Sequence, residues 1–157
     1  MDFGRLQRGE FIGFAGAAVL AAALLLLDWF STNEGNDNAN INGSPAPDGL
    51  TGWETYGTVL SWLLLAACIA PFILAWIVVR GHKLTWRPGE ITMIVGMTAF
   101  ALIILNGVVL GRPGDPDSEI DIEMGYYVGL LGAAMICAGG ILRQAQGGRN
   151  RKPPGTL

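Results

Sequence analysis

An uncharged apolar stretch from Tyr56 to Val79 constrains this chain more than any other feature. The stretch contains 24 consecutive residues without a charged side chain, and the basic segment Arg80 to Lys83 follows it directly. An α-helix of that length rises about 36 Å, which exceeds the roughly 30 Å hydrocarbon core of a bilayer. The stretch is therefore predicted to span a membrane as a helix.

Three further apolar blocks accompany this stretch. The four predicted spans cover about residues 11–30, 56–79, 91–111 and 124–142. A chain that is 51% hydrophobic and only 15% charged is more apolar than soluble domains of similar length. The predicted fold is therefore an all-α integral membrane protein, a four-helix transmembrane bundle.

The charges divide between the two sides of this predicted bundle. If the connections alternate, nine of the ten Lys and Arg residues lie on one side, and Arg112 lies opposite with ten of the thirteen acidic residues. Basic loops remain in the cytoplasm during insertion. Both termini are therefore predicted to be cytoplasmic, an N-in/C-in topology.

The remaining segments complete the predicted organisation. Residues 1–10 form a cytoplasmic lead, 11–143 the transmembrane domain, and 144–157 a basic, disordered cytoplasmic tail. Outer loops are expected at 31–55 and 112–123, and an inner loop at 80–90. Residues 31–52 contain five Asn and four Gly with few apolar side chains, so a flexible external loop is expected there.

The first apolar block also resembles a secretory signal peptide, because Arg5 and Arg8 precede an alanine and leucine run. The small residues 21–23, however, are followed by four leucines, so a cleavage site would fall inside the apolar block. An uncleaved span is therefore favoured.

Small residues recur every four positions in the first and fourth spans. Such ladders lie on one helix face and allow another helix to approach closely. Spans one and four are therefore predicted to pack together through two sets of small residues: Gly9, Gly13, Ala17 and Ala21 in span one, and Gly125, Gly129, Ala133 and Cys137 in span four.

A few polar side chains are candidates for a functional role. Asp28, near the outer end of span one, could exchange protons, although a carboxylate that reaches water is the simpler interpretation. Asn106 within span three could bind a substrate or join neighbouring helices by hydrogen bonds. Alternating acids in the second outer loop could bind cations or form a solvated negative face; they are Asp115, Asp117, Glu119, Asp121 and Glu123.

Several classes of chemistry lack the residues that they need. The single His lies in the inner loop, so no bis-histidine haem, zinc site or external nucleophile–His–acid set can be assembled. Cys68 and Cys137 both lie inside predicted spans, so they cannot form a disulfide that links loops. The sequence therefore predicts no catalytic residues, metal or cofactor, and the chain is expected not to be an enzyme.

Four short motifs mark the ends of the spans: Arg8-Gly9-Glu10, Asp28-Trp29-Phe30, Trp53-Glu54-Thr55-Tyr56, and the run from Tyr127 to Ala133. In these motifs the chain resembles the uncharacterised small four-helix integral membrane proteins common in actinobacterial genomes. The chain departs from that family at Asp28, where many members have proline. Claudin-like proteins share the topology, but their first outer loop is longer and carries a Cys pair that this chain lacks. The resemblance implies the fold and a bacterial plasma membrane, and it implies no activity.

The sequence thus favours a non-enzymatic membrane protein that is a subunit or accessory component of a larger membrane complex. Its expected partners are the lipid bilayer and either another membrane protein or a second copy of itself. Nucleic acid is not expected as a partner, because the net charge is −3. The alternative is a small homo-oligomeric channel or a proton-coupled transporter.

Overall fold

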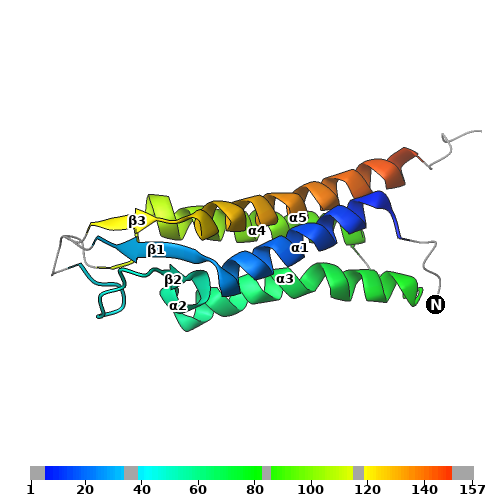
Figure 1. Ribbon diagram of the computed structural model, residues 1–157. Coiled ribbons are helices and arrows are strands. Elements are labelled where there is room, and N and C mark those ends of the chain that lie inside the picture. The colour runs from blue at the N-terminus through cyan, green and yellow to red at the C-terminus, as the bar shows by residue number, and fades with distance from the viewer. Residues whose placement is uncertain (1–5, 34–38, 83–85, 115–118, 150–157) are drawn as a thin grey trace, which may run out of the picture.

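Four long helices dominate the computed structural model, which describes residues 6–33, 39–82, 86–114 and 119–149. They are α1 (Arg8–Leu26), α3 (Thr58–Val79), α4 (Pro88–Ile104) and α5 (Met124–Arg149). A π-helical segment, η2 (Leu105–Val109), extends α4. All four helices are long and apolar enough to cross a membrane. Figure 1 shows them side by side, with α1 beginning and α5 ending at the same end of the bundle.

The helix starts follow local rules. In α1, the backbone N–H of Gln7 donates to the Glu10 carboxylate at 2.7 Å in a capping box. Pro88 opens α4, where its missing N–H costs no hydrogen bond. Helix α3 continues through Pro71 without interruption from Thr58 to Val79.

Helix α5 forms the centre of the bundle. It packs extensively against α1 on one side and α4 on the other, whereas α3 makes smaller contacts with α1 and α4. The interior contains fully buried Leu20, Leu24, Leu64, Ile103 and Ile136. Large apolar side chains remain exposed on all four helices, as expected for surfaces that face lipid.

A three-stranded antiparallel sheet closes the other end of the bundle, hereafter the sheet end (Figure 1). Strand β1 (Asp28–Thr32) lies between β2 (Leu50–Thr51) and β3 (Ile120–Ile122). Phe30 pairs with Ile122, and Thr32 with Ile120. The short helix α2 (Gly52–Thr55) connects β2 to the start of α3.

This sheet corrects the expectation of an all-helical fold. The sequence predicts that residues 28–30 end span one, but α1 ends at Leu26 and Asp28 begins a strand. The backbone of residues 28–32 pairs with β2 and β3, and both Trp29 and Phe30 are buried, which agrees with an extended conformation here.

The first outer loop is also more ordered than expected. Ala39, Ile41 and Ala46 are buried, and the Ala46 N–H donates to Thr32 Oγ1 at 2.9 Å. The few apolar residues of this segment thus supply enough buried surface to order residues 39–52. Residues 34–38 of the predicted loop lie outside the described part of the chain.

The C-terminal boundary differs from the prediction as well. The sequence predicts a disordered tail from residue 144, but residues 144–149 continue helix α5 as far as Arg149. Residues 150–157 lie outside the described residues.

Candidate functional site

The expected pairing of the first and last spans is present, and it brings two backbones together. A Cβ atom added to Gly16 would lie 2.7 Å from the Ile136 nitrogen and 2.8 Å from the Gly132 carbonyl oxygen. Near the other end, a Cβ on Gly139 would lie 2.6 Å from both the Gly13 nitrogen and the Gly9 carbonyl oxygen. Only glycine fits positions with such short separations.

The face of α5 that contacts α1 is not the predicted one. Gly132 and Gly139 face α1, whereas Ala133 and Cys137 lie against Gly96 of α4. Gly140 also lies against α4, where it meets the Met93 nitrogen and the Gly89 carbonyl oxygen. Helix α5 therefore has two neighbouring rows of small residues, one for each flanking helix. On α1, Ala17 is fully buried and Ala21 is half-buried.

Gly125 and Gly129 have a different role, because they accommodate the Trp29 side chain. A Cβ on Gly129 would lie 2.5 Å from the Trp29 ring. The indole N–H donates to the Ala23 carbonyl oxygen at 2.7 Å, and the ring makes edge contacts with Tyr56 and Tyr126. Trp29 therefore fills the space between α1 and α5 at the sheet end.

A buried ion pair lies near the opposite end of the bundle. Arg143 Nη1 donates to Glu10 Oε1, and their side chains are only 13% and 6% exposed. A small cavity beside the pair is lined by Gly13, Pro71 and Thr92. The pair joins α1 to α5, whereas the charge pattern predicts only a cytoplasmic position for Arg143. The burial of Arg143 could have been predicted from the sequence, because Arg143 follows the small residues 139–140 within an apolar helix.

The acidic residues at the sheet end do not form a metal site in the described chain. Glu119 accepts from Asn33 Nδ2 at 3.1 Å, and Glu123 accepts from Ser31 Oγ at 2.6 Å. Asp121 is exposed on β3. No group of three or more metal-ligating side chains occurs among residues that the structure describes. Asp115 and Asp117 lie outside them.

Asp28 is not embedded in a span. It is exposed at the start of β1, paired with Thr51 of β2. Its carboxylate is therefore not enclosed by other parts of the described protein.

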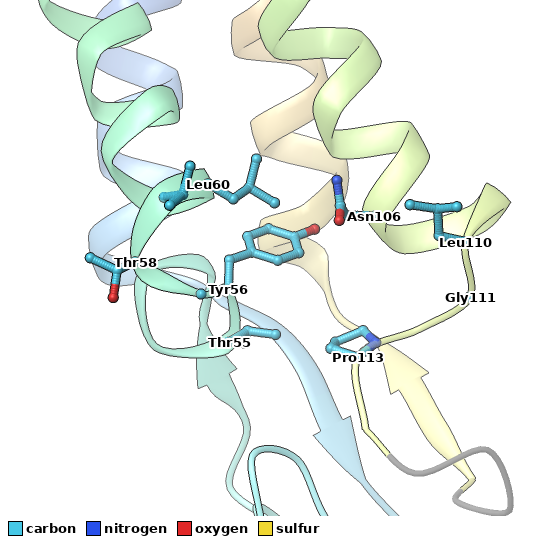
Figure 2. Close-up of a pocket in the computed structure, with 10 residues that line it drawn as sticks. Thr55, Tyr56, Thr58, Leu60, Asn106, Leu110, Gly111 and Pro113 are labelled. Atoms are coloured by element: carbon cyan, nitrogen blue, oxygen red, sulfur yellow. The ribbon is translucent and has the colours of Figure 1, made fainter.

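Asn106 lines a cavity with a volume of about 660 Å³. Tyr56 lines it from just before α3, Thr58 and Leu60 from the first turn of α3, and Leu110 and Pro113 from the segment after α4 (Figure 2). Figure 2 shows the Tyr56 ring between the two helices, with its hydroxyl directed toward Asn106. Tyr56 is 7% exposed, and its hydroxyl has no hydrogen-bond partner within the described residues. The sequence analysis did not identify Tyr56 as a site residue, because tyrosine is common at the ends of membrane-spanning helices.

Asn106 lies in the π-helical segment η2. The Leu110 N–H donates to the Leu105 carbonyl oxygen five residues earlier at 2.8 Å. Side chains donate to carbonyls at the switch from α to π: Asn106 Nδ2 to Leu102 at 2.9 Å, and the Tyr126 hydroxyl to Ile103 at 3.2 Å. Single π turns of this kind are frequent at functional sites.

Burial also affects the acidity of the tyrosine in this cavity. Loss of hydration raises the pKa of Tyr56 above its ordinary value, and the neighbouring Tyr126 raises it further. Tyr56 therefore remains a neutral phenol that can donate a hydrogen bond at physiological pH.

Comparison with known proteins adds no functional assignment. No protein-family model matches the chain, and neither the curated proteins nor the solved structures include a significant match.

Proposed function

We propose that this chain is a non-enzymatic integral membrane protein, a subunit or accessory component of a larger complex in the bacterial plasma membrane. Four helices of sufficient length and apolarity support membrane insertion. The concentration of basic residues at one side supports an orientation with both termini in the cytoplasm.

The observation that carries this proposal is the contrast between the close packing of α1, α4 and α5 and an apolar outer face. Glycine contacts bring α1 and α4 against the backbone of α5, and Trp29 packs against α5 at the sheet end. These glycine rows are buried within the bundle, so a partner must bind elsewhere. Helix α3 has an exposed row at helical spacing, the α3 row, which consists of Trp62, Ile69, Ile73 and Trp76.

Truncation of the α3 row tests this proposal. The double variant Ile69→Ala and Ile73→Ala is expected to reduce recovery of a stoichiometric partner about tenfold, because each truncation removes apolar contact area. The measurement is purification of the tagged protein from its native membrane in mild detergent, followed by mass spectrometry. Leu131→Ala, at an exposed position of α5, is the matched control and should retain the partner. Recovery of the wild-type protein only as a self-oligomer would contradict the accessory role.

The second candidate function is a small channel or proton-coupled transporter, and the buried Glu10–Arg143 pair is the observation that favours it. An acid in an apolar helix can couple proton movement to transport. In liposomes, this function predicts that Glu10→Gln abolishes a proton-linked flux and that Asp28→Asn leaves it unchanged, because Asp28 is exposed. A flux that requires Asp28 and survives Glu10→Gln would refute this assignment.

A further inference from the structure

Two hollows between α3 and α4 lie in line with each other. The cavity of about 660 Å³ at the sheet end is lined by Leu60 and Asn106. A second hollow of about 370 Å³ begins one helical turn further along each helix, at Leu63 and Leu102. The two hollows follow one another along α3 and α4; they are called here the head cavity and the tail groove, and together the α3–α4 cleft.

The head cavity contains a buried hydroxyl that lacks a partner. The Tyr56 hydroxyl makes no hydrogen bond among the described residues. Asn106 donates its amide nitrogen to the Leu102 carbonyl oxygen, and its own amide oxygen is an acceptor. A buried hydroxyl that donates no hydrogen bond destabilises the protein, so a ligand that supplies an acceptor oxygen would be stabilised here. The Asn106 oxygen could in turn accept from a ligand hydroxyl.

The head cavity also excludes charge. All ten residues that line it are uncharged, among them Thr55, Gly57 and Pro113. A phosphate or an ammonium group bound there would gain no ionic partner from these residues. The ligand head is therefore neutral, with both a hydroxyl and a carbonyl oxygen.

The tail groove matches a hydrocarbon chain. Five of its nine lining residues are small, and the other four are Leu, Ile and Val residues; the small ones are Ala66, Ala67 and Ala70 on α3 and Thr98 and Ala99 on α4. From Asn106 to Ile94, at the far end of the groove, the helix rises about 18 Å. The groove is therefore almost wholly apolar, and it begins about one helical turn from the head cavity.

We propose that this cleft binds a neutral glycerolipid of the diacylglycerol class. Its free hydroxyl and ester carbonyl lie at Asn106 and Tyr56, and one acyl chain follows the groove between α3 and α4. This inference goes beyond the proposed accessory role, since the lipid site faces the α3–α4 cleft and does not depend on a protein partner.

A photoreactive diacylglycerol tests the site in the full chain embedded in phosphatidylcholine nanodiscs. Labelled peptides are expected from residues 56–70 and 94–110, and unlabelled dioleoylglycerol should compete. Tyr56→Phe is expected to weaken competition about five- to tenfold, since one hydrogen bond is lost. Ala66→Trp fills the exposed side of the groove and should abolish specific labelling.

Matched controls separate recognition from general effects on the fold. Tyr127→Phe and Ala134→Trp change exposed residues of α5 outside the cleft and should leave labelling unchanged. Tyr56→Phe removes a buried hydroxyl that has no hydrogen-bond partner among the described residues, so its thermal stability without diacylglycerol should be at least that of the wild type. Labelling elsewhere, unchanged competition in Tyr56→Phe, or equal competition by phosphatidylglycerol or a quinone would overturn the proposal. Recovery of a protein partner is a separate measurement, so the two proposals can fail independently.

Discussion

Gly132→Leu is expected to disrupt the folded bundle. The Gly132 position leaves no room for a side chain, because a Cβ there would lie 2.6 Å from the Leu20 nitrogen and 2.9 Å from the Gly16 carbonyl oxygen. These are backbone atoms of a facing helix, so they cannot move aside as a flexible side chain would. Separating α1 from α5 would also weaken contacts along the whole interface. The expected loss in unfolding free energy is about 3 kcal/mol or more.

Unfolding in mixed micelles, followed by circular dichroism, measures this loss. Ala134→Leu provides a control two residues further along the same helix, at an exposed position, and it should change stability little. A Gly132→Leu protein as stable as Ala134→Leu would show that α1 and α5 do not pack as described.

The four helices could be predicted because length and apolarity alone specify them. The stretch from Tyr56 to Val79 became α3 with a shift of two residues, since Gly57 acts as the N-cap. Such a prediction needs only the local sequence, because the thickness of a bilayer sets the number of apolar residues that a spanning helix must contain.

The glycine contacts could be predicted only in part. The four-residue spacing of small residues in α5 predicted that this helix packs closely against α1. The glycines of α5 that face α1 are, however, seven residues apart. The same spacing occurs in three helices: Gly132 and Gly139 of α5, Gly9 and Gly16 of α1, and Gly89 and Gly96 of α4. A seven-residue repeat keeps one seam facing a partner along a slightly tilted helix pair. The seven-residue spacing of glycines would therefore have been a better predictor of the contact faces than the four-residue spacing.

The sheet could not be predicted, because its strands are short and distant in sequence. Strand β3 has three residues, and Phe30 pairs with Ile122. Strand formation here depends on tertiary contacts: the Glu123 N–H donates to the Trp29 carbonyl oxygen at 2.9 Å, and Trp29 packs on Gly125 and Gly129. Neither the head cavity nor the unpartnered Tyr56 hydroxyl has a local sequence signature, because each requires α3 and η2 to be placed together.

Removing the carboxylate of Glu10 is expected to have the second large effect. Glu10→Gln leaves the Arg143 guanidinium without its counter-charge. Because the Arg143 side chain is only 13% exposed, water cannot replace the lost partner. Breaking one partner of a buried pair typically costs about 3–5 kcal/mol, since the remaining charge keeps its dehydration penalty. The exposed pair formed by Arg87 and Glu90, with a separation of 3.9 Å, is the natural comparison. Glu90→Gln should cost about 1 kcal/mol or less, because water screens that pair.

A double-mutant cycle determines whether the loss belongs to the pair itself. Glu10→Gln combined with Arg143→Met removes both charges, so the double variant should be more stable than Glu10→Gln alone. The backbone N–H of Gln7 still finds an acceptor in the amide oxygen that Glu10→Gln introduces, which keeps the α1 cap in place and isolates the electrostatic contribution. Unfolding free energies of the four proteins in the same micelles provide the coupling energy. Additive losses would mean that Glu10 and Arg143 act independently, and the ion pair would then stabilise neither the contact between α1 and α5 nor a proton-coupled state built on it.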